Sequence, residues 1–156
     1  MAEEKILTAR VAALFSVARP AYIATFVNAC LLLLVLWEAF PVALLLWWFG
    51  AIAAVTLARA ALHRAYARDA ARHTPQAWES LFTLGAIAAG ALWTYPPAVF
   101  LPVGDPLLQM AVIFVVGGTI IGAMGVYASS PAAFYGFCLL PFLAVVFQLA
   151  IQGGRS

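Results

Sequence analysis

The chain carries no charged residue between Pro106 and Gly154, and this stretch constrains the fold more than any other feature. As one α-helix it would extend roughly 70 Å at 1.5 Å per residue, whereas the hydrocarbon core of a bilayer is about 30 Å thick. The stretch therefore has to fold back, and Ser129–Pro131 is the best candidate for the turn. We expect two membrane-spanning helices here, over about 106–127 and 132–152.

Three further apolar segments precede this stretch, and composition supports a membrane environment for all of them. Hydrophobic residues make up 66% of the 156 residues and charged residues only 9%, against roughly 25% charged in a soluble domain. We predict spans over about 21–39, 41–62 and 78–95, the last stopped by Pro96–Pro97. The expected fold is all-α, a polytopic integral membrane bundle of about five transmembrane helices, with no separate soluble domain.

Two polar segments flank the first two predicted spans. In residues 1–19 apolar residues are spaced among charged ones as in an amphipathic helix, which predicts a cytoplasmic amphipathic helix in the headgroup region, ended by Pro20. The loop 63–77 is basic. Its arginines recur every fourth residue, which predicts that the second helix continues out of the membrane with a stripe contacting lipid headgroups, Arg64, Arg68 and Arg72. A second loop, 98–105, is apolar and is expected to rest against the interface.

Basic residues gather on one side of this arrangement and predict its orientation. Seven of the eight lie on the side of the amino terminus, and Arg155 lies on the other side with Glu38 and Asp105. Arg59 is counted among the seven because its long side chain could extend from the span to the interface. Because basic residues are retained in the cytoplasm, the amino terminus should be cytoplasmic. With five crossings the carboxyl terminus would then lie on the outer side.

Motifs for catalysis are missing from the sequence, so we do not expect an enzyme. There is no HExxH, CxxC, GxSxG or phosphate-loop pattern, and no carboxylate lies deep in a predicted span. His63 and His73 fall in the polar loop, where they suit neither haem nor metal. We expect no cofactor and no nucleic-acid partner.

Polar and aromatic residues in the spans supply candidates for a ligand site. Asn28, near the middle of the first span, would bond another helix or contact a ligand. Gln109 and Gln148 fall at the same predicted depth as several aromatic residues. Together they could line a cup for a lipid-like or quinone-like ligand, or the aromatics could be ordinary interfacial residues: Trp37, Trp47, Trp93 and Tyr95.

Small residues form stripes on two predicted spans and indicate close helix packing. The span 106–127 contains Gly118, Gly122 and Gly125, with a GxxxG pair between the first two, and the span 78–95 contains Gly85 and Ala89. Such stripes allow two backbones to approach closely. They would serve either packing inside one bundle or a seam between two copies, so the expected partners are lipids and a homodimer or other membrane proteins.

Scattered segments in fixed order carry a family resemblance. They are RVAALF at 10–15, FVNA at 26–29, the Trp pair 47–48, VTLAR at 55–59, GAIAAGALW at 85–93, DPLLQ at 105–109, ASSP at 128–131 and Gln152-Gly153. This order resembles the amino-terminal membrane module of bacterial sensor histidine kinases and GGDEF-type diguanylate cyclases.

The resemblance implies a sensor module in the bacterial inner membrane that regulates a cytoplasmic output domain through helix repacking. Such modules have a sixth crossing after the position of Gly153, whereas this chain stops at Ser156. The chain would then be either part of a sensor or a small stand-alone membrane protein. The alternative from another class is a non-catalytic accessory subunit of a larger membrane complex.

Overall fold

The protein is all-helical in the computed structural model, which describes residues 2–101 and 105–153. No strand occurs in these two ranges. In chain order the helices are α1 (Ala2–Ser16), α2 (Ala18–Leu36), α3 (Val42–Arg68), the 3₁₀ turn η1 (Ala70–Arg72), α4 (Pro75–Val99), α5 (Pro106–Tyr127) and α6 (Pro131–Gly153).

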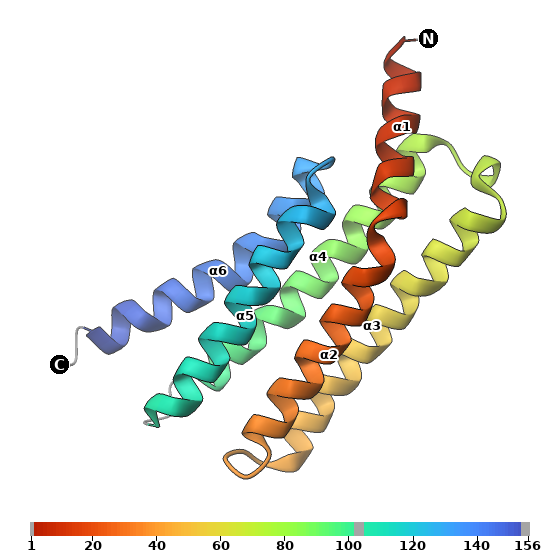
Figure 1. Ribbon diagram of the computed structural model, residues 1–156. Coiled ribbons are helices and arrows are strands. Elements are labelled where there is room, and N and C mark those ends of the chain that lie inside the picture. The colour runs from red at the N-terminus through yellow and green to blue at the C-terminus, as the bar shows by residue number, and fades with distance from the viewer. Residues whose placement is uncertain (1, 102–104, 154–156) are drawn as a thin grey trace.

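The helices run up and down between two ends of an elongated bundle (Figure 1). One end holds α1, η1 and the turn between α5 and α6. The other end holds the short turn between α2 and α3, the start of α5 and the carboxyl end of α6. Proline and capping residues start two of the helices: Pro75 follows Thr74, whose hydroxyl accepts from the Ala77 N–H, and Pro106 follows Asp105, whose carboxylate accepts from the Leu107 N–H.

Four helical segments within the described ranges are long and apolar enough to cross a membrane. They are Glu3–Leu36, Val42–Arg68, Pro106–Tyr127 and Pro131–Gly153. The predicted span 78–95 corresponds to α4, which is not among them. The physical reason lies in its composition and position: its second half carries Trp93, Tyr95 and Pro96–Pro97, and many of its side chains are buried by protein, so α4 needs less apolar surface than a lipid-facing helix.

The backbones of α4 and α6 approach each other closely at two glycines. A Cβ added to Gly90 would lie 2.8 Å from Phe137 Cα, and one added to Gly136 would lie 2.6 Å from the Ile87 side chain. Ala89 is buried beside this crossing. The small residues of α4 thus face another helix of the same chain, as close helix packing requires.

Several predicted boundaries need correction. Pro96–Pro97 lies inside α4 instead of ending it, and the Phe100 N–H still donates to the Pro96 carbonyl, so one more turn follows. Pro20 sits in the first turn of α2, where a missing N–H costs no bond, and the break falls at Val17. The helix α3 ends at Arg68 because Asp69 is extended. Residues 102–104 of the predicted loop 98–105, and Arg155, lie outside the described residues.

The apolar face of α1 is buried in the protein, whereas we expected it to lie in the headgroup region. Val11, Leu14 and Phe15 are each at most 2% exposed. The Phe15 ring stacks on Tyr66 of α3 at a centroid distance of 4.1 Å and meets Trp78 of α4 edge-on at 5.9 Å. The reason is that α3 and α4 extend far enough for their aromatic side chains to pack against α1.

Candidate functional site

Arg59 lies inside the bundle, although we expected its side chain to reach the membrane interface. It is only 4% exposed. Its Nη2 donates a hydrogen bond of 2.5 Å to the hydroxyl of Tyr127 on α5. The guanidinium carbon lies 5.0 Å from the ring centre of Tyr22 on α2 and 6.0 Å from that of Phe82 on α4. One cation therefore contacts three other helices.

The guanidinium of Arg59 contacts aromatic rings and a hydroxyl, and no described acid neutralises its charge. Across residues 2–101 and 105–153 no carboxylate lies within ion-pair distance of it; the salt bridge seen there joins Arg10 to Glu79. Cation–π contacts contribute about 0.5–2 kcal/mol each, against a cost of several kcal/mol for burying an ion. Gly85 makes room for the side chain, since a Cβ there would lie 3.0 Å from Arg59 Cγ.

A cavity of about 80 Å³ lies between α2 and α5, and Tyr127, the hydrogen-bond partner of Arg59, is one of its lining residues. Asn28 and Thr119 face it from opposite helices, and the Asn28 amide donates to the Thr119 hydroxyl at 3.0 Å. The other lining residues are Ala21, Ala24, Thr25, Gly118, Gly122, Ala123, Val126, Tyr127 and Phe137. Asn28 therefore bonds another helix, as one of the two predicted roles required, and it also lines a cavity.

Two hydroxyls in the cavity wall keep unused hydrogen-bonding capacity. Thr25 is 7% exposed, and its hydroxyl has no hydrogen-bond partner among the residues described. Tyr127 is 3% exposed; its oxygen accepts from Arg59, and no described group accepts its own O–H. The wall thus offers donors in excess of the bonds made within the protein.

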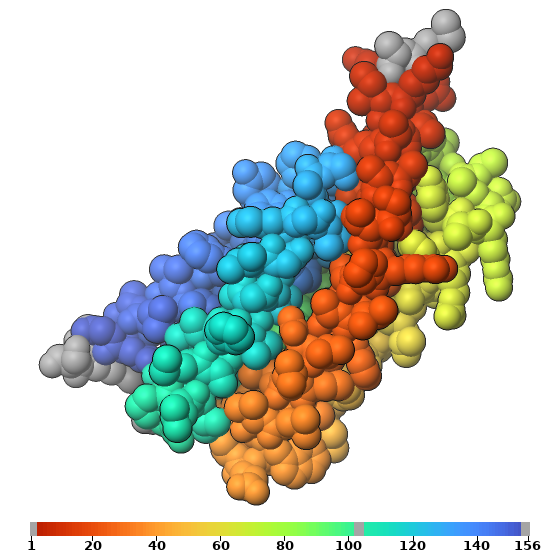
Figure 2. Space-filling model, in the orientation of Figure 1, coloured from red at the N-terminus to blue at the C-terminus, as the bar shows by residue number. Residues whose placement is uncertain are grey.

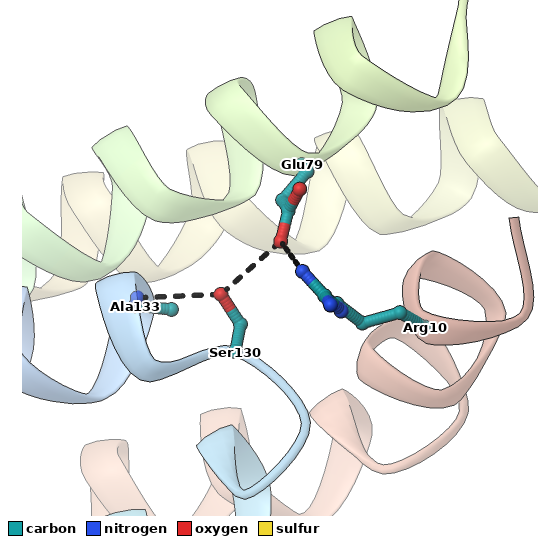
Figure 3. A network of polar contacts seen from close by, with 4 residues as sticks. All are labelled: Arg10, Glu79, Ser130 and Ala133. Atoms are coloured by element: carbon teal, nitrogen blue, oxygen red, sulfur yellow. Dashed lines mark hydrogen bonds and ion pairs between the residues drawn. The ribbon is translucent and has the colours of Figure 1, made fainter. Parts of the chain in front are cut away.

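A polar network at the same end of the bundle joins three parts of the chain (Figure 3). Arg10 of α1 pairs with the Glu79 carboxylate of α4 at 3.5 Å, and the Ser130 hydroxyl donates to the same carboxylate oxygen at 3.4 Å. The Ala133 N–H donates in turn to Ser130 Oγ at 3.4 Å, so Ser130 is the N-terminal cap of α6.

The cavity and the network are separated by one tight turn. Tyr127 is the last residue of α5, and the Ser130 N–H donates to its carbonyl at 2.9 Å. A displacement of Tyr127 would therefore move Ser130 and alter its hydrogen bond to Glu79. This connection could not be read from the sequence, because Glu79 and Ser130 are far apart along the chain.

The aromatic cup predicted near the outer end is divided between separate contacts. Trp93 is fully buried and meets Trp48 edge-on at 5.7 Å. Trp47 is 63% exposed and lies against Tyr95 at 5.9 Å, and Trp37 is also exposed. Of these aromatics, Trp93 has become a core residue.

The remaining predicted residues occupy varied positions. Gln148 donates to the Ala98 carbonyl at 3.1 Å, and Gln109 is half-buried near the start of α5. Gly118, Gly122 and Gly125 are exposed, and a Cβ at any of them would meet nothing within 4 Å. The basic stripe is shorter than expected. Arg64, Arg68 and Arg72 are all exposed, but Arg72 lies in η1, beyond the end of α3 at Arg68.

Sequence reasoning missed Thr25, Thr119, Tyr127 and Glu79. Thr25 and Thr119 look like ordinary helix residues. A signal for the buried site was that Arg59 lies well before the end of its apolar helix.

Within the described part of the chain, no group of three His, Cys, Asp or Glu side chains could hold a metal ion. Comparison of the chain with family models, with curated proteins and with solved structures finds no match.

Proposed function

We propose that this chain is a membrane-embedded signal-input module that regulates a cytoplasmic output domain through helix repacking. The observation that carries the proposal is the short path from the cavity, through Tyr127 and Ser130, to the Glu79–Arg10 pair. A module of this kind needs two packings that bind a stimulus differently.

The topology we propose has five crossings, with α4 as the third. The end of α3 and the start of α5 lie at opposite ends of the bundle (Figure 1), so α4 has to span whatever thickness its neighbours span. Its 25 residues give about 37 Å of helix, which is enough. Basic residues near α1, the end of α3 and η1 favour a cytoplasmic location for that end, in a bacterial inner membrane.

Thiol labelling in intact cells tests this topology. A cysteine introduced at exposed Arg68 should resist a membrane-impermeant thiol reagent, and one at Asp105 should react, in a background where Cys30 and Cys138 are replaced by alanine. Reversed labelling would show that the orientation is wrong.

Signal transfer is tested by measuring whether the cytoplasmic end has two packings. Spin labels at exposed Thr8 of α1 and Ala132 of α6 would report their distance distribution in lipid nanodiscs. Replacement Y127F removes the hydroxyl that accepts from Arg59 and should shift the distribution. The matched control is Y135F, on a tyrosine that is 62% exposed on α6, which should leave it unchanged.

The outcome that contradicts the proposal is a single distance distribution that neither replacement alters. In that case the bundle has one packing, and the path from Tyr127 to Arg10 transmits nothing. A shift with Y127F alone supports a switch between two packings.

A non-catalytic accessory subunit is the second candidate, and the exposed glycines of α5 favour it. A Cβ added at Gly118, Gly122 or Gly125 would meet nothing within 4 Å, so a helix of another protein could pack there closely. Native mass spectrometry of the protein extracted from its own membranes separates the candidates. Fixed stoichiometry with other proteins favours the subunit, and a homodimer of a longer polypeptide favours the sensor. Replacing both Gly118 and Gly122 by isoleucine should abolish either assembly if this face is the seam.

A further inference from the structure

The cavity between α2 and α5 is too large to be explained by one structural water. Its volume is about 80 Å³, and one water needs roughly 10–15 Å³ on the same measure. Exposed Ala24, Gly118 and Gly122 are part of its wall, so it opens onto the outer surface between the two helices. These surfaces lie side by side, in orange and blue-green, in Figure 2.

The polar wall of the cavity selects for a hydrogen-bond acceptor. Among the described residues, the Thr25 hydroxyl has no hydrogen-bond partner and the Tyr127 O–H has no acceptor. One amide N–H of Asn28 donates to Thr119, and no described group accepts from the other. Groups of this kind can donate hydrogen bonds to an oxygen atom of a ligand.

Charge behind the wall selects further for an anion. The Arg59 guanidinium donates to the Tyr127 oxygen, and this bond strengthens the tyrosine as a donor on its other side. No carboxylate of the described chain lies within ion-pair distance of Arg59. A negatively charged oxygen one hydroxyl away would compensate a buried charge that the protein leaves open.

The surroundings of the cavity mouth select for an amphiphile. The two helices that frame it belong to segments long and apolar enough to cross a membrane, so the mouth, with exposed Ala24, Gly118 and Gly122 in its wall, opens onto an apolar surface. A soluble ion would have to cross this apolar surface. A molecule with an acyl chain would instead lie along it, and the glycines of α5 leave a shallow path for the chain.

We propose that this cavity binds the oxyanion headgroup of a membrane amphiphile, a carboxylate or a phosphate, through the Tyr127 and Thr25 hydroxyls and the free Asn28 N–H, with Arg59 as the balancing charge. The inference rests on the proposed function only in so far as this amphiphile would be the stimulus. The site itself is independent of signalling.

Binding to the purified full chain in maltoside micelles tests the site, with two pairs of probes read out by native mass spectrometry. Oleate is compared with oleyl alcohol, and dioleoyl phosphatidylglycerol with dioleoylglycerol. We expect one molecule of at least one charged probe per chain, bound about tenfold or more tightly than its neutral partner, because a hydrogen bond to a charged group contributes that factor. Oleate alone would identify a fatty acid as the source, and the phospholipid alone a lipid phosphate.

Three variants locate the binding. Y127F and T25V each remove one donor and should weaken the charged probe about tenfold, R59M should weaken it at least as much, and the control Y135F should not. The two conservative variants keep the shape of the side chain, so one remains informative if another fails to fold. Equal binding of charged and neutral probes, or unchanged binding in Y127F and T25V, would overturn the proposal.

The two proposals can fail separately. Specific binding without any change in the Thr8–Ala132 distance means a lipid site that is not an input. A Tyr127-dependent distance change without binding of any charged probe removes this ligand class and leaves the signal-input function standing.

Discussion

The crossing of α4 and α6 gives the sharpest stability prediction, at Gly90. An alanine Cβ there would lie 2.8 Å from Phe137 Cα and 2.9 Å from the Gly136 carbonyl oxygen, and closer still to the Phe137 carbonyl oxygen. Ordinary Cβ contacts lie at 3.4–4 Å, so the helices would separate by at least about 0.6 Å to bring 2.8 Å up to 3.4 Å. All three neighbours are backbone atoms, which no rotamer change can move.

The expected cost of Gly90→Ala is about 1–3 kcal/mol of unfolding free energy relative to Gly117→Ala. The control lies in the middle of α5, where a Cβ meets nothing within 4 Å. Both replacements gain the same intrinsic helix propensity, about 1 kcal/mol, so the difference isolates the clash. The assay is reversible unfolding by SDS in mixed micelles, followed by tryptophan fluorescence. Equal unfolding free energies for the two variants would refute the tight crossing.

Three further predictions concern polar groups. Trp48→Phe should cost about 0.5–1.5 kcal/mol more than Trp93→Phe in the same assay. The Trp48 Nε1–H donates to a backbone carbonyl at 2.9 Å, whereas the buried Trp93 Nε1–H has no partner among the described residues; equal costs would contradict this. A double-mutant cycle of Arg10→Gln and Glu79→Gln should give a coupling of about 0.2–1 kcal/mol that falls with added salt, because both side chains are partly exposed at 41% and 22%; a salt-independent coupling would mean a drier pair. Arg59→Met should be at least as stable as the parent chain without ligand, since it removes a buried charge that no acid balances, and clear destabilisation would show that the aromatic cage outweighs the desolvation cost.

Helix positions followed well from the sequence because they depend on local information. Hydropathy, proline and glycine act over one or two turns, and α5 begins and ends at Pro106 and Tyr127 as predicted, with α6 within one residue at each end. The errors came where tertiary contact overrides a local signal. Pro96–Pro97 did not end α4, because its last turn is buried against the rest of the bundle.

The candidate site was less accessible to prediction. Asn28 was identified as the polar residue of its span, and it does line the cavity. The GxxxG pair was also identified from the sequence. The sequence did not predict that Gly118 and Gly122 would be exposed and line the same cavity as Asn28. Register and rotation between helices decide such neighbours, and periodicity within one helix carries no information about them.

The sequence by itself determined that the chain is helical, where the apolar segments lie and which end collects the basic residues, because these depend on composition and spacing along the chain. Only the tertiary structure decided that Arg59 is enclosed by Tyr22, Phe82 and Tyr127, and that Glu79 meets both Arg10 and Ser130. The physical reason is that these contacts join residues from different helices. Their geometry is fixed by which helix faces pack together, and packing is a property of the whole bundle.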